Sequence, residues 1–205
     1  MSDFDNINKY VASVIMSGGK SRRMNNDNKS FIKLNNLPLI SHVIKTISLQ
    51  SNYIVINANR DINRFNKLGY DVVSDSIKDF PGPLAGVLSG MDWMINSHLK
   101  CKWLFTSPTD APFLPVDIIE RLYLSCIKDK KLISLSKSRG RLHPVFALWN
   151  LSLVEDLRKS INNGVRKVED FTINYNPSIE EFFGDIDPFF NINTPEDLKV
   201  AQTFI

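Results

Sequence analysis

Short apolar runs alternate with segments of helical periodicity through the first two thirds of the chain, and no other feature constrains the fold as strongly. The apolar runs, which predict buried strands, lie at 11–17, 53–57, 71–74 and 102–106. The helical patterns lie at 38–47, 61–68, 84–95 and 116–127. Because parallel strands need long crossover connections, which are usually helices, this order predicts an α/β fold. We expect three layers, in which a mostly parallel sheet carries helices on both faces.

The last third of the chain has a less regular pattern. Apolar runs at 132–135 and 145–149 predict two further strands, and 151–161 predicts a helix. Thr194 followed by Pro195 marks the start of a final helix, because threonine is a favoured cap and proline fits the first helical position. The direction of the outer strands stays open. With 205 residues, 43% of them hydrophobic, and no linker or internal repeat, the chain is expected to form a single domain.

Charge and composition exclude several classes of function. The net charge is +3 with both signs mixed along the chain, which suits small anions and lacks the basic stripe that duplex nucleic acid needs. No apolar run is long enough to span a bilayer, and the polar, acidic start of the chain is not a secretory signal. Cys101 and Cys126 have no metal-ligand spacing, so we expect buried, reduced thiols. These features predict a soluble, cytoplasmic protein that binds neither nucleic acid nor a membrane.

A glycine pair follows the first predicted strand directly. Gly18 and Gly19 let the backbone approach a ligand closely and direct its N–H groups at phosphate. Arg22, Arg23 and Lys29 then bring positive charge to the same loop, where it would stabilise a departing pyrophosphate. Taken alone, the glycine pair is more typical of an ordinary turn beside a solvated basic loop, because short glycine motifs match by chance.

Two common nucleotide-binding motifs are absent from this loop. The segment Gly19-Lys20-Ser21 looks like the end of a P-loop, but that motif requires a glycine where Val14 stands inside the strand. The polar residues at 25–28 also keep the loop irregular, whereas a P-loop continues into a helix. The dinucleotide fingerprint G-x-G-x-x-G is missing as well.

Polar residues stand at the ends of the later predicted strands. Asn57 ends the second strand, Asp75 follows the third, and Asp110 lies in a proline-rich turn after the fourth. Ligands of open parallel sheets bind beyond the carboxyl ends of the strands, so these residues are candidates for one site. Asp110 suits a magnesium ion, which takes few protein ligands and keeps its waters. Taken singly, Asn57 and Asp75 are more typical of turns, and Asp110 could cap a following helix.

Five segments, in this order, resemble the molybdenum cofactor guanylyltransferases, a MobA-like family of nucleotidyltransferases. They are GGKSRRM (18–24) with Lys29, PGPLAG (81–86), DAPFLP (110–115), RLHP (141–144) and NINTPED (191–197). The likeness extends from about Val11 to Gln202. It implies a Rossmann-like nucleotidyltransferase fold and a transfer of GMP from GTP to molybdopterin or the molybdenum cofactor, with release of pyrophosphate. It also implies that the single domain, 1–205, has a nucleotide-binding half at about 10–110 and an acceptor-binding half at about 111–205.

The resemblance assigns roles to residues by position. The nucleotide-binding residues would be Met16, Ser17, Gly18, Gly19, Lys29, Asn57, Asp75 and Asp110, and the acceptor-binding residues would be Gly82, His143, Asn191 and Asn193. Asp110 would hold Mg²⁺, the implied cofactor, and catalysis would rest on Arg23, Lys29 and Asp110. Besides the two substrates, molybdenum-insertion proteins and molybdoenzyme chaperones would be candidate partners.

Two alternatives remain beside this interpretation. One is a cytidylyltransferase or a sugar-nucleotide pyrophosphorylase of the same fold, against which the pair Gly18-Gly19 argues, because those relatives more often carry Ala-Gly there. The other is a nucleotide-binding protein without catalysis, against which the presence of both Lys29 and Asp110 argues. The sequence shows no Ser-His-Asp or Cys-His pairing, so no side-chain nucleophile is expected. Asn28 stands where the family usually has aspartate, which removes a negative charge from the loop.

Overall fold

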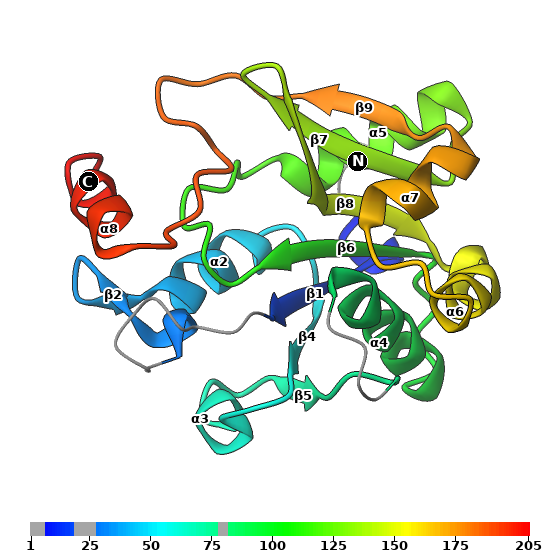
Figure 1. Ribbon diagram of the computed structural model, residues 1–205, viewed down its shortest axis with the longest axis horizontal. Helices are drawn as coiled ribbons and strands as arrows, with labels where there is room; N and C mark the ends of the chain where they lie inside the picture. Colours follow the sequence, from blue (N-terminus) through cyan, green and yellow to red (C-terminus); the bar gives the residue numbers. More distant parts are fainter. Residues whose placement is uncertain (1–6, 19–27, 78–81) are drawn as a thin grey trace.

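A mixed seven-stranded sheet forms the centre of the protein in a computed structural model that describes residues 7–18, 28–77 and 82–205 (Figure 1). The strands, in spatial order, are β5 (Asp71–Val73), β4 (Tyr53–Ala58), β1 (Val11–Ser17), β6 (Trp103–Pro108), β8 (Arg141–Asn150), β7 (Ile133–Ser138) and β9 (Ser178–Glu181). All neighbouring pairs are parallel except the two that involve β8, so β8 alone runs against the others. The mostly parallel sheet is therefore confirmed.

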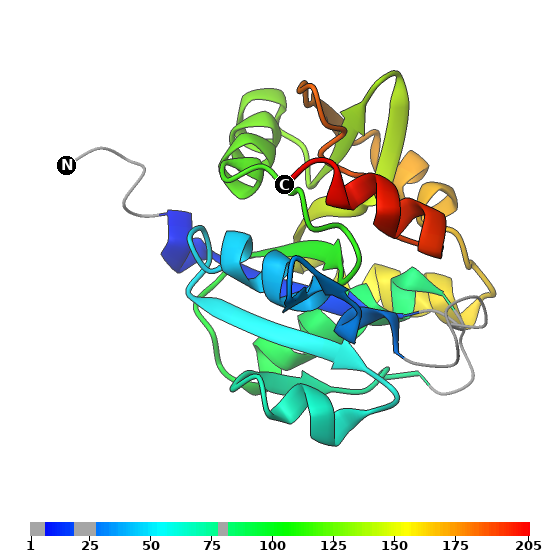
Figure 2. The ribbon, with the colours of Figure 1, turned by 90° about the vertical axis from the view of Figure 1, so that its left-hand side faces the viewer.

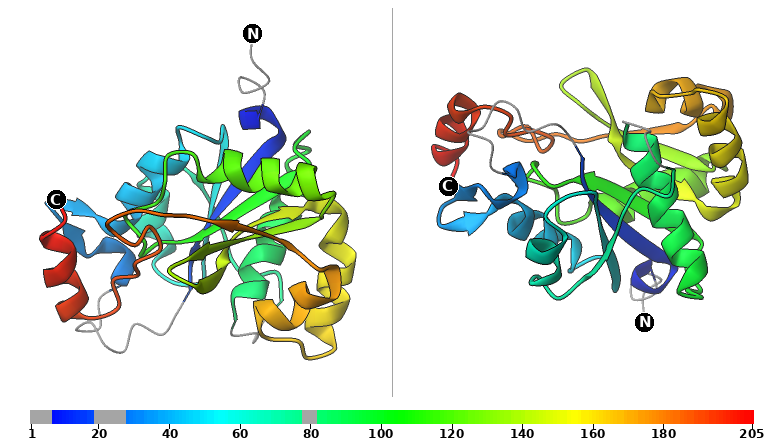
Figure 3. Two further views of the ribbon diagram at one scale, coloured as in Figure 1. Left: turned by 90° about the horizontal axis from the view of Figure 1, so that it is seen from above. Right: turned by 60° about the horizontal axis from the view of Figure 1, so that its bottom comes forward.

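Helices cover both faces of this sheet, as Figure 3 shows from above. One face packs against α4 (Pro83–Asn96), α6 (Val154–Asn162) and α7 (Val168–Thr172), and the other against α2 (Leu39–Ile47), α3 (Ile62–Asn66) and α5 (Ile118–Asp129). Alternation along β1 explains the two cores, since Ala12, Val14 and Met16 join the first and Val11 and Ile15 the second. The three-layer α/β prediction is confirmed.

A small third cluster joins two distant parts of the chain. The hairpin of β2 (Lys33–Leu34) and β3 (Leu37–Pro38) lies beside α8 (Pro195–Gln202), the last helix (Figure 2). Leu34, Leu39, Ile192 and Ala201 are buried together between them. Because this cluster ties the carboxyl-terminal segment to the loop region after β1, it brings the 191–197 segment close to Lys29.

Several elements differ from the expectations. Pro38 was expected to open the helix, but it belongs to β3, and α2 begins at Leu39. Residues 151–161 form a 3₁₀ turn, η3 (Leu151–Leu153), before α6. The short elements α1 (Ile7–Tyr10), α7, η4 (Ile173–Tyr175) and β9 were not predicted. Their sequences are too short or too polar to show a period, and packing against the larger elements stabilises them.

The structure also bears on two further predictions, which concern membrane-spanning segments and the two cysteines. Within 7–18, 28–77 and 82–205, no helix combines the length and the apolar character needed to cross a bilayer. Cys101 and Cys126 are buried free thiols, as predicted. Burial raises the pKa of the Cys101 thiol to about 11 and that of Cys126 to about 12.

Candidate functional site

Lys29, Asp110 and Asn193 converge beyond the carboxyl ends of β1 and β6. The Lys29 ammonium forms an ion pair with the Asp110 carboxylate and donates a hydrogen bond of 2.6 Å to Asn193 Oδ1. The side chains of Lys29 and Asp110 are each 16% exposed, so the pair is shielded without being cut off from solvent. Three predicted site residues from separate parts of the chain therefore meet.

The turn that carries Lys29 is fixed by its own cap. Lys29 begins η2 (Lys29–Phe31), and the Asn28 amide oxygen accepts a hydrogen bond of 3.1 Å from the Ser30 backbone N–H. An amide oxygen caps such a turn about as well as a carboxylate. Asn28 in place of the usual aspartate thus keeps the local geometry while lowering the negative charge.

The segment that carries Asn193 is held at both ends. The Ile192 N–H donates to the Asp110 carbonyl oxygen at 3.0 Å. The N–H groups of Asn193 and Thr194 both donate to Asp197 Oδ2 at 2.8 Å, and Thr194 and Asp197 form a reciprocal capping box on α8. The predicted cap is confirmed, and α8 thereby positions the asparagine that contacts Lys29.

A chain of hydroxyl groups connects the ends of β1 and β6. Ser30 Oγ donates to Thr109 Oγ1 at 2.8 Å, and it lies 3.0 Å from Ser17 Oγ. Because the single Ser30 hydroxyl hydrogen points to Thr109, Ser17 is the donor in the second bond. Ser30 and Thr109 are buried. Sequence reasoning missed both, and their only signal is that they stand next to Lys29 and Asp110.

A second cluster lies at the ends of β4 and β5. Asn57, 4% exposed, donates to Asp75 Oδ1 at 3.0 Å. Asn59 donates to Asp75 Oδ2 at 2.7 Å and accepts from the Asp75 backbone N–H at 2.9 Å. The structure brings Asn57 and Asp75 together as the strand-end argument predicts, and Asn59 is a neighbour that the sequence analysis missed.

The remaining residues at the end of β1 lie between the two clusters. Met16 is paired in register with Asn57 of β4 on one side and with Pro108 of β6 on the other. Gly18 is exposed, and a Cβ there would contact nothing within 4 Å. Gly19 and Arg23 lie outside the described residues.

Helix α4 packs closely against Met16 and Asn57. A Cβ added to Gly86 of α4 would lie 2.6 Å from Met16 Sδ and 2.9 Å from Asn57 Oδ1. Only a glycine lets α4 come this near without moving those side chains. Gly82, a predicted acceptor residue, is half-buried and directly precedes α4, where its carbonyl oxygen accepts a hydrogen bond from the Ala85 N–H at 3.3 Å.

His143 belongs to a separate network on β8. Its Nε2 lies 2.9 Å from Ser138 Oγ, and Ser138 Oγ donates to Asp187 Oδ1 at 2.8 Å. Its ring packs on Phe189 with the ring centroids 4.7 Å apart. Burial lowers the pKa of His143, although the Asp187 carboxylate acts in the opposite direction. Because Phe189 lies two residues before the 191–193 segment, this ring contact connects His143 to that segment.

This serine, histidine and aspartate trio was not apparent from the sequence, because Asp187 is remote from the other two. It does not have the arrangement of an activated nucleophile. In a catalytic triad the histidine accepts the serine hydrogen and donates to the carboxylate. Here the Ser138 hydrogen points to Asp187, so His143 Nε2 carries the hydrogen of the other bond. The trio orients the His143 ring.

Asp110 is the residue that the family resemblance assigns to a metal ion. Its Oδ1 atom is buried and has no hydrogen-bond partner among the described residues. The same is true of Asn191 Oδ1. Nowhere in the described ranges do three or more histidine, cysteine or acidic side chains gather as metal ligands. A single carboxylate oxygen fits a cation that takes most of its ligands from water and substrate.

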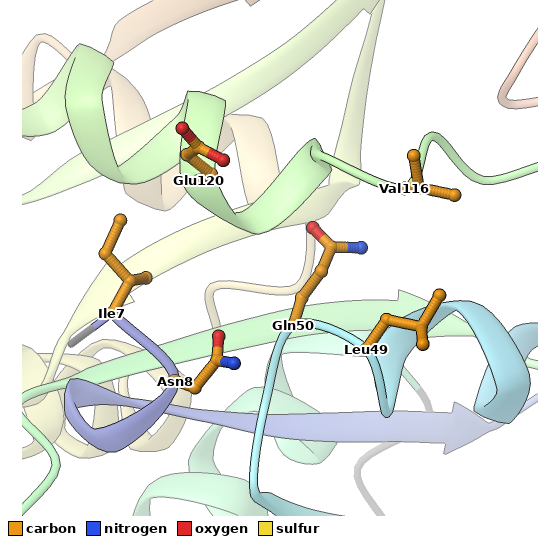
Figure 4. A pocket seen from close by; sticks show the side chains of 6 residues that line it. All are labelled: Ile7, Asn8, Leu49, Gln50, Val116 and Glu120. Carbon is orange, nitrogen blue, oxygen red and sulfur yellow. The ribbon is translucent and has the colours of Figure 1, made fainter. Parts of the chain in front are cut away.

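Two surface cavities lie elsewhere. One, of about 180 Å³, is lined by Ile7, Asn8, Leu49, Gln50, Val116 and Glu120, and these side chains surround it in Figure 4. It lies beside the amino-terminal ends of β1 and β4. The other, of about 450 Å³, lies between α5 and β9. None of the predicted site residues within the described ranges lines either cavity.

Two comparisons of the sequence with known proteins identify its family. The family model described as the MobA-like NTP transferase domain matches residues 13–175. A molybdenum cofactor guanylyltransferase of Rhodopseudomonas palustris (strain BisB5) is 38% identical over 192 residues, which cover 93% of this chain and 91% of the relative.

Solved structures show the same fold. Molybdopterin-guanine dinucleotide biosynthesis protein A of Archaeoglobus fulgidus superposes with a TM-score of 0.75 at 24% identity and covers 95% of this chain and 97% of its own. The 4-diphosphocytidyl-2C-methyl-D-erythritol synthase of Anaerococcus prevotii superposes with a TM-score of 0.69 at 13% identity, covering 98% and 97%. Since one of these names refers to a guanine and the other to a cytidine nucleotide, the fold by itself does not select the base.

Proposed function

The chain belongs to the MobA-like NTP transferase family, and we propose that it acts as a molybdenum cofactor guanylyltransferase, which transfers GMP from GTP to molybdopterin or the molybdenum cofactor. The observation that carries this proposal is the convergence of Lys29, Asp110 and Asn193 at the strand ends. It supplies one cation, one anion and one neutral donor–acceptor group where open α/β sheets bind their ligands.

The reaction is an in-line attack by the terminal phosphate of the pterin on the α-phosphorus of GTP, with pyrophosphate as the leaving group. No covalent step on the protein is required, so catalysis rests on positioning and on charge stabilisation. Lys29, together with Arg23, offsets the charge of the departing pyrophosphate. The orientation of the Ser138 hydroxyl supports a route without a protein nucleophile.

Nucleotidyltransferases of this family generally use a divalent metal ion. We propose that the ion is Mg²⁺ and that Asp110 holds it, because Asp110 Oδ1 has no partner among the described residues. Bound there, it would supply positive charge to the phosphate oxygens. The Lys29 ammonium has three donors and uses two of them on Asp110 and Asn193, so the third is available for a phosphate oxygen of the nucleotide.

The two halves of the chain supply different sides of this site. The first, about 10–110, contributes Met16, Ser17, Gly18, Gly19, Asn57 and Asp75, which we assign to GTP along with Lys29 and Asp110. The second, about 111–205, contributes His143, Asn191 and Asn193, which we assign to the pterin together with Gly82. The contact between Lys29 and Asn193 supports this division, because it joins the two groups of residues where the phosphates would meet.

The cellular setting follows from this activity. GTP and the pterin are the substrates, and molybdenum-insertion proteins and molybdoenzyme chaperones are the proposed further partners. The cytoplasm is the proposed location, and the free thiols Cys101 and Cys126 support a reducing compartment.

A nucleotide comparison tests the proposed activity. Thermal shift with GTP, CTP, ATP and UTP in the presence of Mg²⁺ should show stabilisation by GTP alone, and Lys29→Ala should abolish it. Lys33→Ala is the matched control, because Lys33 is an exposed lysine on β2 that makes no contact with Asp110 or Asn193. Incubation with GTP and molybdopterin should then release pyrophosphate. A preference for CTP would support the cytidylyl alternative, and nucleotide binding without pyrophosphate release would support a protein that binds without catalysis.

A further inference from the structure

Asp75 is held by two asparagine side chains, one on each carboxylate oxygen. Asn57 donates to Oδ1 at 3.0 Å and Asn59 donates to Oδ2 at 2.7 Å. Asn59 also accepts from the Asp75 backbone N–H at 2.9 Å, so the side chain and the backbone of Asp75 are gripped together. Because a backbone N–H can only donate, this second bond fixes which end of the Asn59 amide faces the carboxylate.

The two asparagine side chains leave lone pairs on both Asp75 oxygens available for a ligand. An ionised carboxylate has about four lone-pair sites, and the asparagine amides occupy one on each oxygen. The remaining site on each oxygen can accept a hydrogen bond from a ligand with two adjacent donors. In a nucleotide, two groups have this form, namely the N1–H and N2–H pair on the edge of guanine and the pair of ribose hydroxyls.

The sheet order distinguishes these two groups. The Asp75 strand end, at β5, lies three strand spacings from β6, which precedes Asp110, a separation of about 14 Å. Lys29 and Asp110 mark the phosphate end of the proposed site. The ribose hydroxyls lie near the phosphates in a nucleotide, and the base edge is its far end. The separation therefore favours the guanine edge.

We propose that Asn59 is a positioning and specificity-determining residue, which with Asn57 holds the Asp75 carboxylate so that it accepts the N1–H and N2–H donors of guanine. This inference rests on the proposed function and adds the group that selects the base. Asn59 is exposed and belongs to the segment directly after β4, so it can act without a role in the core.

Calorimetric binding of GTP, inosine triphosphate and 2′,3′-dideoxy-GTP tests the inference. Inosine triphosphate lacks the N2 amino group, so the wild-type protein should bind it about tenfold more weakly than GTP, as expected for one lost hydrogen bond to a charged group. In Asn59→Ala the GTP affinity should fall and the preference for GTP over inosine triphosphate should approach one. Asn63→Ala, an exposed asparagine on α3, is the matched control and should keep the wild-type preference.

A second variant guards against a general loss of folding. Asn59→Asp keeps the size of the side chain but places a like charge beside Asp75, and it should remove the preference while its melting temperature stays near that of the wild type. An equal loss of affinity for GTP and inosine triphosphate in both variants would overturn the inference alone. The inference would also be overturned if the wild-type protein bound 2′,3′-dideoxy-GTP more weakly than GTP but bound inosine triphosphate as tightly as GTP. That result would assign Asp75 to the ribose hydroxyls. Failure of the wild-type protein to bind GTP at all would overturn the proposed function as well.

Discussion

Lys29 and Asp110 lie 81 residues apart in the chain and form an ion pair where β1 and β6 end. On the lysine side the pair has one additional neutral partner, Asn193, and on the aspartate side it has a buried oxygen with no hydrogen-bond partner among the residues that the structure describes. In the absence of substrate the lysine neutralises the carboxylate, which keeps the cost of its partial burial low. Phosphate groups entering the site compete for the same ammonium group.

Replacement of Asp110 by asparagine should show how much the charge of this side chain contributes to turnover, because its size stays the same. Asp110→Asn keeps the volume but loses the anionic oxygen, so turnover should fall by about a hundredfold or more, the size seen when one strong electrostatic contact to a reacting group is lost. Pyrophosphate release under saturating GTP and pterin measures this. Asp117→Asn, which removes an exposed carboxylate without a side-chain cap bond, should leave turnover unchanged. Near-normal turnover in Asp110→Asn would rule out the metal role.

Two glycines on α4 provide a matched pair. A Cβ at Gly86 would press on Met16 and Asn57, whereas a Cβ at Gly90 would lie 2.9 Å from both Val14 and Leu104 in the core. Each alanine variant should destabilise the fold by about 1–3 kcal/mol through overpacking. Gly86→Ala alone should also weaken GTP binding, because it displaces Asn57. Melting curves and calorimetry separate the two effects, and equal GTP affinity in both variants would contradict the assignment.

Folding stability should depend on the protonation of His143. Burial lowers the pKa of His143 below its ordinary 6.5, so the unfolded chain binds this proton at a higher pH than the folded protein does. The free energy of unfolding is therefore largest above pH 6.5 and falls as the pH drops through the window below it. Urea unfolding above and below pH 6.5 measures the slope. His143→Gln should show a smaller decrease than the wild type, and an identical pH dependence would refute the prediction.

The two thiols should resist modification in the folded protein. With pKa values of about 11 and 12, Cys101 and Cys126 hold very little thiolate at neutral pH. Their reaction with Ellman's reagent should be slower than that of a free thiol by about a hundredfold for Cys101 and about a thousandfold for Cys126, and fast once the chain is unfolded. Absorbance at pH 7 with and without denaturant measures the difference. Rapid reaction of two thiols per native chain would show that these side chains are accessible.

The elements that could be predicted are those with a strong local period. The buried run 11–17 and the helix around 84–95 match β1 and α4 closely, because burial on both sheet faces and on one helix face imposes those patterns. β9 was missed because Ile179 is the only apolar residue of an edge strand. The amino-terminal part of β8 was missed because it is polar and contains Pro144.

The sequence alone determined the layered fold, the glycine pair after the first strand and the polar residue types at the strand ends. Each of these depends on a pattern of residues that are neighbours in the chain. It also determined the family, through motifs whose order survives without coordinates. Only the tertiary structure decided which side chains meet: Ser30 with Thr109, Asn59 with Asp75, and Asn193 with Lys29. Each contact joins residues at least 16 positions apart. Such contacts depend on strand order and on the docking of α8, and no local pattern of residues encodes either one.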